Sequence, residues 1–410
     1  MIKRSDMLDD NSPDGIEVIQ ITDEEAIPSS HVYMEAQIFT PDSKRFVLHR
    51  QAHAHGPHHD QPGHQYLLCD IEDDCSLAPL TDEPQAIAPS VSPDGKTLYY
   101  IIDQSRSGRG SISLKRVDLD GTGREVLAVL DQGIPGDGRS PSSIYPLSTI
   151  SPDGRRLATA AFLGDGQTED APFGLLVFDL ESGDCRIALE GQSWCNIHPQ
   201  YSRNPEAAHD IMVQENHGNQ CDPEGKIVGL TGGNGADIHV IRDDGTNFRS
   251  FPWGRDGNEF AQGHQCWRGR SDKGITSTVT RDIEEEQLIE SPAVDIDSHE
   301  GLKIPGGQRN DLSRDFTKPG FCHFATDIAG ERFISDCGPF QNGGRLFYGC
   351  LPEAEGQPFS ELKYLLSPGH AVDKTTHVHP FLSPDGKLGF FNSAESGILQ
   401  AYMISGLGRL

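Results

Sequence analysis

The chain has no long apolar run and no excess of positive charge. No stretch approaches the apolar length of a membrane-spanning helix. Lys and Arg number 34 against 62 Asp and Glu, which gives a net charge of −28 at pH 7. Nucleic acids and anionic membranes require a basic face on their partner, so we expect neither as a partner. The N-terminal residues include Lys and Arg but no apolar segment behind them, so we also expect no secretory signal.

Paired cysteines and a serine nucleophile motif are missing as well. The nine cysteines are scattered and include no C-x-x-C pair, which is typical of free thiols in a reducing cytoplasm. No Gly-x-Ser-x-Gly elbow occurs, so serine-hydrolase chemistry has no support. Apolar residues make up only 35% of the chain, whereas Gly and Pro number 45 and 27. This composition predicts many turns rather than long helices.

A repeated turn sequence is the dominant pattern in the chain. Copies of Ser-Pro-Asp-Gly-Lys, complete or nearly so, occur at 41–44, Ser92 to Lys96, Ser151 to Arg155 and Ser383 to Lys387. Pro followed by Asp-Gly suits a tight reverse turn, and each copy is followed by a β-rich apolar run. The first three copies are about 52 and 59 residues apart, so further, degenerate copies should lie between the third and the last. We expect them at 201–205, 270–274 and 326–330.

Seven units of roughly 50–65 residues are typical of a radially repeated all-β fold. We therefore predict an all-β protein, with residues 28–410 forming a single seven-bladed β-propeller. Residues 1–27 should be either a leader or a strand that closes the ring. Closure by pairing the two terminal segments would remove exposed sheet edges.

Histidines are concentrated in a few segments. One group, from His53 to His64, lies in a Gly- and Pro-containing stretch between two predicted strands, where it could scavenge metal or have no site at all. A second group occupies four segments, each shortly before a repeat turn, and contains His198, His264, His323, His377 and His379. Equivalent positions in a repeat protein fall at equivalent places around the axis. The second group should thus converge on one mouth of the channel.

The spacing of His377 and His379 suggests a metal site. In a strand, residues two apart point to the same side, so both imidazoles could bind one ion, with a third from a neighbouring blade. The alternative is that these histidines pack between blades through hydrogen bonds. Four segments in register favour a site over that alternative.

The same segments resemble the oligogalacturonate lyases. Residues Thr376 to Lys387 and Phe390 to Gly397 are similar to the last blade of that family, where His-Pro-His-Pro precedes a Pro-Asp turn. Further segments that resemble the family, between about 190 and 405, are 198–200, 215–218, 243–247, 263–267, 321–324 and 333–336.

The resemblance implies a function and a set of site residues. Members of the family are seven-bladed propellers that hold a divalent metal, usually Mn²⁺, and cleave short galacturonate oligomers by β-elimination. The resemblance implies that His323, His377 and His379 bind the metal and that His264 removes the C5 proton. An imidazole suits that role because its pKa lies near neutral pH. We expect the pocket for this small acidic oligosaccharide to be lined by His198, Gln200, Gln265 and Lys374. Trp267 either stacks on a sugar or packs in the core.

Two positions depart from the family pattern. Lys374 stands in place of a glutamine ligand, and Asp237 stands in place of an arginine that contacts the substrate. These departures leave open a related eliminase or hydratase acting on another sugar. A non-enzymatic TolB-like propeller that binds a partner protein is the other alternative, because Ser-Pro-Asp-Gly repeats are typical of those scaffolds too.

Overall fold

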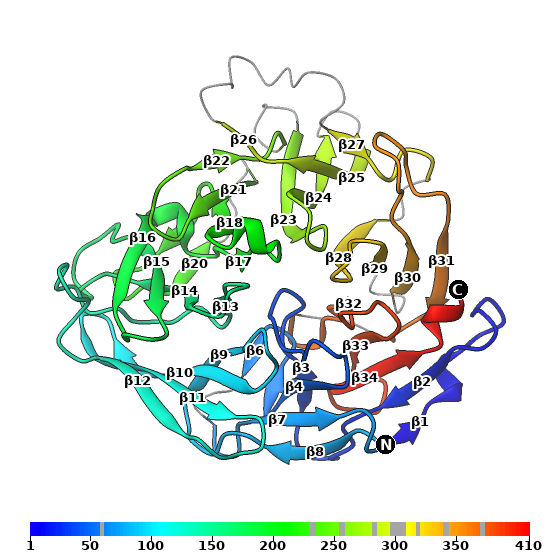
Figure 1. The fold of residues 1–410 in the computed structure, drawn as a ribbon, viewed down its shortest axis with the longest axis horizontal. Coiled ribbons are helices and arrows are strands. Elements are labelled where there is room, and N and C mark those ends of the chain that lie inside the picture. Colours follow the sequence, from blue (N-terminus) through cyan, green and yellow to red (C-terminus); the bar gives the residue numbers. More distant parts are fainter. Residues whose placement is uncertain are drawn as a thin grey trace.

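The computed structural model of the chain describes residues 1–57, 61–229, 235–253, 259–280, 285–295, 309–316, 320–338, 344–369 and 374–410. Within these ranges the protein consists of β-strands and short 3₁₀ segments, without an α-helix. The all-β prediction is therefore confirmed. The antiparallel sheets stand around a common centre, with one edge strand of each sheet nearest to it (Figure 1). In the described ranges no helix has the length and apolar character needed to cross a membrane.

Four sheets have four strands each, in the order of the sequence. The first contains β3 (Ser29–His31), β4 (Arg45–Arg50), β7 (Gln65–Asp70) and β8 (Ser76–Pro79). The second contains β9 (Ala86–Val91), β10 (Thr97–Arg106), β11 (Arg109–Asp118) and β12 (Glu125–Leu130). The third contains β13 (Thr149–Ile150), β14 (Arg156–Phe162), β15 (Phe173–Asp179) and β16 (Cys185–Gly191). The fourth contains β28 (Phe321–Thr326), β29 (Arg332–Cys337), β30 (Arg345–Cys350) and β31 (Leu362–Leu366).

A larger, nine-stranded sheet consists of two groups of strands. One group contains β17 (Gln200–Tyr201), β18 (Asp210–Asn216), β21 (Ala236–Arg242) and β22 (Arg249–Ser250). The other contains β23 (Glu259–Trp267), β24 (Lys273–Thr280), β25 (Glu285–Pro292), β26 (Val294–Asp295) and β27 (Asn310–Asp311). Among the described residues, β21 and β23 pair only at Ala236 and Ala261, and β22 also pairs with β26. Each group therefore has its own inner strand, β17 or β23.

The last sheet joins the two ends of the chain. It contains β32 (Phe381–Leu382), β33 (Gly389–Ser393) and β34 (Gln400–Ser405), followed by β2 (Glu17–Gln20) and β1 (Ile2–Lys3). Glu17 pairs with Ser405, and Gln20 pairs with Tyr402. The N-terminal segment thus forms the outer strands of the C-terminal sheet, which Figure 1 shows as blue strands beside red ones.

The remaining elements are short. Two small hairpins are β5 (Ala52–His53) with β6 (Gly56–Pro57) and β19 (Gln220–Cys221) with β20 (Ile227–Gly229). The described 3₁₀ segments are η1 (Ser5–Met7), η2 (Gln192–Trp194), η3 (Pro205–Ala207), η6 (Lys374–Thr376) and η7 (Leu407–Arg409).

The Ser-Pro-Asp-Gly segments form the turns that the sequence predicts. In the copy after β9, the Ser92 hydroxyl donates to Asp94 Oδ1 (2.6 Å) and accepts the backbone N–H of Thr97 (3.0 Å). Gly95 closes the turn at φ 68°, a left-handed conformation that favours glycine. All seven predicted turns, including the three degenerate copies, lie at or next to the connection between an inner strand and its neighbour. This shared position puts the residues before each inner strand at the opposite end of the strands from the turns.

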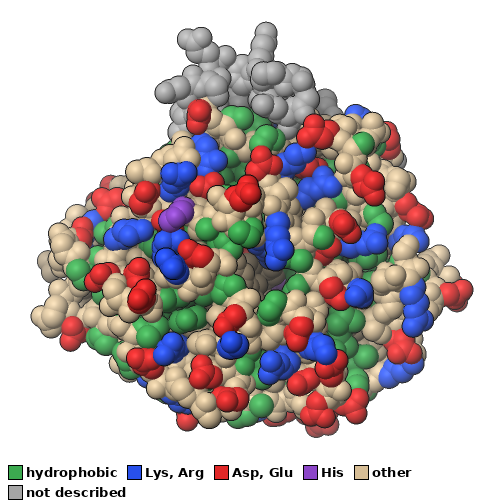
Figure 2. All heavy atoms as spheres, viewed as in Figure 1, with side chains coloured by type: hydrophobic (Ala, Val, Ile, Leu, Met, Phe, Trp, Pro, Cys, Tyr) green, Lys and Arg blue, Asp and Glu red, His purple; other side chains and the backbone are tan. Residues whose placement is uncertain are grey.

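Aromatic side chains fill the space between the first and last sheets. Phe46 contacts Phe39 and Phe390 at ring-centroid distances of 5.1 and 5.0 Å, and Phe381 stacks on Phe390 at 5.1 Å. Burying a side chain of this size contributes about 1.5–3 kcal/mol. On the outside, acidic side chains (red) are spread over the face shown in Figure 2, and the centre of that face is hollowed.

Candidate metal centre and active-site cavity

A cavity of about 880 Å³ lies where the inner strands begin. Its wall includes residues just before or at the start of three inner strands: His198 before β17, His323 in β28 and His377 before β32. The wall also contains three residues of β23 and three that follow β3 or β4: Gln262, Gly263, His264, Tyr33, His53 and His55. The predicted convergence of histidines from successive repeats is therefore what the structure contains.

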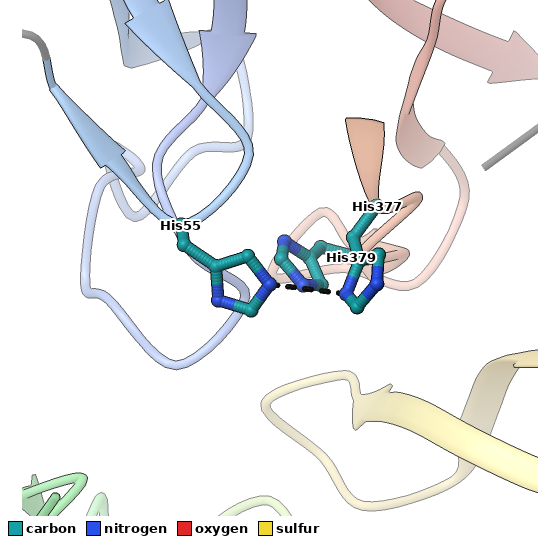
Figure 3. Close-up of side chains that lie close together, drawn as sticks. All are labelled: His55, His377 and His379. Atoms are coloured by element: carbon teal, nitrogen blue, oxygen red, sulfur yellow. Dashed lines mark hydrogen bonds between the residues drawn. The ribbon is translucent and has the colours of Figure 1, made fainter. Parts of the chain in front are cut away.

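Three imidazoles meet at the edge of this cavity (Figure 3). His55 Nε2 lies 3.0 Å from His377 Nδ1, and the His379 ring centroid lies 4.6 Å from that of His55 and 5.5 Å from that of His377. One nitrogen from each of the three rings can be chosen so that all lie within 4.8 Å of one another. These three side chains could share one ion after small rotations.

His323 and His264 extend the cluster. The His323 ring centroid is 4.3 Å from that of His379, 5.4 Å from that of His377 and 4.5 Å from that of His264. The nitrogens of His264 and His323 and the Cys322 sulfur form a second group within 4.8 Å. The three predicted metal ligands are thus in mutual contact, with the predicted base beside them.

Hydrogen bonds fix which ring nitrogens face the cluster. His379 Nδ1 lies 3.1 Å from the carbonyl oxygen of Ala54, so Nδ1 carries the proton and Nε2 keeps its lone pair. That Nε2 is buried and has no hydrogen-bond partner among the described residues. His323 Nδ1 donates to Asp336 Oδ2 (2.9 Å), while Asp336 Oδ1 accepts the backbone N–H of His323 (2.7 Å). A carboxylate behind an imidazole is the usual outer support of a metal-binding histidine, so these residues fit a divalent ion.

Burial keeps the imidazoles neutral. It lowers the pKa of His264, His323 and His379 well below the ordinary value, and their imidazole neighbours lower it further. Burial and the nearby His377 lower the pKa of His55 to about 2. Burial raises the pKa of Asp336 to about 7, although hydrogen bonding to His323 and the charges of neighbouring histidines oppose this rise. Neutral imidazoles have the lone pairs that both metal binding and proton abstraction need.

His198 lies across the cavity and is held by a buried acid. Its Nδ1 is 2.8 Å from Glu35 Oε2, and burial raises the pKa of that carboxyl group while His198 opposes the rise. The Tyr33 ring lies between the two sides, with its centroid 5.4 Å from that of His198 and 4.5 Å from that of His379. His198 and His379 both have positive φ, 46° and 45°, and both precede a proline. Such backbone costs about 1–3 kcal/mol per residue.

A β-bulge explains how β23 presents His264. The pairing register of β23 with β24 shifts between Ala261 and Gln265, and Gly263 in the bulge has φ 88°. The strict two-residue alternation is lost there, so three consecutive residues line the cavity. A side chain at Gly263 would also approach Gln214, with its Cβ 3.0 Å from Nε2.

Some predicted pocket residues lie elsewhere. The described cavity lining includes His198 but neither Gln200 nor Gln265. Gln200 Nε2 instead donates to the carbonyl of Gln265 (3.0 Å), and both side chains are buried in the wall between neighbouring strands. The bulge in β23 leaves His264 in the cavity wall and Gln265 outside it, and neither chain neighbour of Gln200 lines the cavity either. Trp267 packs in the core and donates from Nε1 to the Gln200 carbonyl (3.0 Å).

Other predictions concern the histidines near the chain's loops and the two positions, Lys374 and Asp237, that differ from the family pattern. The structure places His377 and His379 between η6 and β32, not in a strand, so the predicted strand geometry is wrong even though the rings meet. Lys374 begins η6, next to the cavity residue Thr375, but its side chain lies outside the described residues, as do His58 and His59. His64 is buried and binds the carbonyls of Arg50 and Ala86. Asp237 lies 3.0 Å from His217 Nε2 and is not among the cavity residues.

Glu35 and Asp336 were not identified as site residues from the sequence, and His55 was named only within the His53 to His64 stretch, where a metal site was left open. His55 reaches the cluster because Ala54 donates its N–H to the Thr375 carbonyl (3.1 Å) and accepts from His379. These contacts are long-range and leave no local pattern. A lone acid such as Asp336, thirteen residues after His323, is also unremarkable in a strand.

Solved structures of propellers resemble this chain. An oligogalacturonate lyase in complex with manganese superposes with a TM-score of 0.69 at 17% identity, covering 95% of this chain and 93% of that one. A second oligogalacturonate lyase, from Vibrio parahaemolyticus, has a TM-score of 0.67 at 14% identity, with 96% and 95% covered. The β-propeller domain of the Trilobed protease from Pyrococcus furiosus has a TM-score of 0.52 at 11% identity, with 94% and 95% covered.

These likenesses define the class of fold. No protein-family profile and no curated protein matches the chain. The protein has a propeller-like all-β fold, and the sequence resemblance to oligogalacturonate lyases is confirmed at the level of that fold, at 14–17% identity.

Proposed function

We propose that the protein is a metal-dependent lyase that cleaves short uronate-containing oligosaccharides, such as oligogalacturonate, by β-elimination. The observation that carries the proposal is the meeting of five imidazoles, those of His55, His264, His323, His377 and His379, beside one cavity of about 880 Å³. The fold likeness to two oligogalacturonate lyases, one of them in complex with manganese, supports the same function.

The metal in this proposal is a divalent ion, with Mn²⁺ as the first choice. His323, His377 and His379 would hold it, and His55, from the His53 to His64 stretch, adds a fourth imidazole. The unpartnered Nε2 of His379 and the Asp336 support of His323 fit this role. When bound, such an ion supplies positive charge to the substrate carboxylate and so acidifies the adjacent C–H bond.

The protein side of the reaction is proton transfer and positioning. Neutral His264 would accept the C5 proton, the C5–H electron pair would form the C4–C5 double bond, and the C4–O bond would break. The departing oxygen would then take a proton, from the protonated His264 or from solvent, leaving a 4,5-unsaturated product and a shortened oligomer. The substrate would contact Lys374 and His198, which lies on the other side of the cavity and is hydrogen-bonded to Glu35.

Replacing His264 with Ala tests the assignment of the base. We expect the turnover to fall by about 10²–10⁴-fold, which is the usual contribution of a general base. The metal content and the melting temperature should stay close to those of the wild type, because the hydrogen bonds that hold His323 and His379 do not involve His264. The assay is the ultraviolet absorbance of the unsaturated product formed from galacturonate oligomers. Activity within a few-fold of the wild type would exclude His264 as the base.

A related eliminase or hydratase acting on another sugar is the second candidate. The observation that favours it is Asp237, an acid where the lyases have an arginine for the substrate, which here contacts His217. Metal bound by the wild type and lost in His379→Ala, together with no activity on galacturonate oligomers, would support this candidate. A chain that binds no metal would instead support a TolB-like binding protein.

The finer organisation of the fold belongs to the same proposal. We propose that residues 28–410 form a single propeller of seven blades, with the nine-stranded sheet counted as two. The pairing of β2 with β34 supports a role of residues 1–27 in closing the ring. The nine free cysteines support a place in the reducing cytoplasm.

A further inference from the structure

A second cluster of metal-ligating side chains lies behind the cavity wall. Glu215 of β18 pairs directly with Asp237 of β21, so their side chains leave the sheet on the same face. His217 follows Glu215 by two positions, and His239 follows Asp237 by two. In this antiparallel pairing His239 lies opposite Val213, and His217 bonds to Gly235, so the two histidines flank the Glu215–Asp237 pair from its two ends.

The ligand atoms of these four residues are already close together. His217 Nε2 lies 3.0 Å from Asp237 Oδ2 and 3.6 Å from Glu215 Oε2, and His239 Nε2 lies 3.1 Å from the same Glu215 oxygen. Ligand atoms of Glu215, Asp237 and His239 lie within 4.8 Å of one another. In a tetrahedral site with bonds near 2.1 Å the ligand atoms are about 3.4 Å apart, so only small rotations are needed.

Neighbouring hydroxyl groups orient two of the four side chains. His239 Nδ1 is 2.7 Å from Ser250 Oγ, and Ser193 Oγ donates to Glu215 Oε1 (2.8 Å). These contacts leave His239 Nε2 and Glu215 Oε2 directed at the shared centre. Phe248 packs against the His239 ring at a centroid distance of 4.7 Å and limits its movement. This is the arrangement of outer partners seen around protein metal ligands.

The cluster has its own access to solvent. A separate cavity of about 570 Å³ is lined by His217 and Ser193, together with residues 170, 172, 191–192, 216 and 218–219. Gln214 and Asn216, on either side of Glu215 in β18, line the large cavity, and Asn216 also borders the second one. The two clusters thus lie on opposite faces of the same strand.

We propose that Glu215, His217, Asp237 and His239 form a second metal site, specific for a zinc-like divalent ion and separate from the histidine cluster in the large cavity. Two imidazoles and two carboxylates suit Zn²⁺, which takes four nitrogen, oxygen or sulfur ligands in structural sites. The ion would tie β18 to β21 behind the cavity wall. It would therefore stabilise the wall without touching the substrate.

Zinc titration of the full chain tests this site. The protein is stripped with a chelator and titrated with Zn²⁺ by calorimetry, as the wild type, as His239→Gln and as a variant that carries His323→Ala and His379→Ala. We expect the wild type to bind two equivalents of Zn²⁺. The His239→Gln variant should lose the ion of the second site, and the double variant should lose the ion of the histidine cluster. Ser250→Ala should weaken the second site by about 10–100-fold, as outer-partner changes do.

The outcomes separate this site from the proposed active site. If the double variant and the wild type bind the same single equivalent, and His239→Gln removes it, the proposed function fails but the second site stands. If His239→Gln and Asp237→Asn both bind Zn²⁺ as the wild type does, the second site is refuted. The four side chains then form only a hydrogen-bonded ion-pair network. Asp237→Asn is nearly isosteric, so it remains informative if His239→Gln does not fold.

Discussion

Asp336 gives the sharpest test of the metal centre, because it touches His323 with both oxygens and can be changed without a change in volume. In Asp336→Asn the amide oxygen can still accept the backbone N–H of His323, now 2.7 Å from Oδ1. The amide NH₂ would then face Nδ1, where Oδ2 stands at 2.9 Å. Since an NH₂ group only donates, His323 would move its proton to Nε2 and lose the lone pair that faces the cluster.

The expected size of the effect follows from these contacts. Loss of such a carboxylate support typically weakens metal binding by about 10–100-fold, or about 1.4–2.7 kcal/mol. Both contacts with His323 can remain hydrogen bonds, the second now donated by the amide NH₂ to Nδ1, so the stability without metal should fall by at most about 1 kcal/mol. At a metal concentration 100 times the dissociation constant, the wild type gains about 2.7 kcal/mol from binding, and the variant should lose a large part of that gain.

The assay is calorimetric titration with Mn²⁺ between pH 6 and 8, supported by melting curves with and without the ion. Burial raises the pKa of Asp336 to about 7, and only the ionised carboxylate holds His323 in the binding tautomer. Affinity in the wild type should therefore rise with pH through about 7, and this rise should be absent in the variant. Asp327→Asn is the control, because Asp327 Oδ1 accepts the N–H groups of Glu331 and Arg332 in the turn at the other end of the same strands. An affinity within two-fold of the wild type in Asp336→Asn would refute the reasoning.

Two further predictions concern stability. Burial lowers the pKa of His31 from 6.5 to about 4, so between these pH values the unfolded chain binds a proton at His31 and the folded chain does not. The free energy of unfolding is therefore highest above pH 6.5 and falls as the pH drops toward 4. In urea unfolding, His31→Gln should show about 3 kcal/mol less change in this free energy over the same range. A fall in stability with pH that is identical in both proteins would contradict this. Gly269→Ala should lower the stability by about 2–4 kcal/mol, because φ is 49° and the new Cβ would lie 2.7 Å from the Ile328 carbonyl oxygen. Gly121→Ala, with φ 84° and open space around it, should lower it by only about 1 kcal/mol. Equal urea midpoints for the two variants would exclude the close backbone approach at Gly269 as the cause.

The repeat turns made the fold predictable. Ser92 and Gly95 set a local hydrogen-bond pattern that recurs at Ser151 and Ser383, and a local pattern can be recognised without knowledge of the rest of the chain. The degenerate copy at 326–330 forms a comparable turn, with Asp327 accepting the backbone N–H groups that Ser92 accepts in the complete copy. The register of these turns also predicted that His198, His264, His323, His377 and His379 would converge, and all five lie around or beside one cavity.

The parts that were not predicted depend on long-range or irregular structure. His55 joins the cluster through contacts of Ala54 with Thr375 and His379, which lie more than 300 residues away in the sequence. The bulge at Gly263 shifts the alternation of β23, so the sequence period could not tell that His264 faces the cavity and Gln265 does not. The same loss of period applies to His377 and His379, whose backbone is not a strand.

The pairing of β2 with β34 also has a consequence for how the protein folds during synthesis. Residues 17–20 cannot find their partners at 402–405 until nearly the whole chain has left the ribosome. At about 5–20 residues per second, the first strands wait roughly 20–80 s for the last one. During that time the Val18 side chain, buried in the finished sheet, and the unpaired edge of β2 are open to other chains. Completion of the last sheet is therefore the step at which a nascent chain of this protein most needs protection from aggregation.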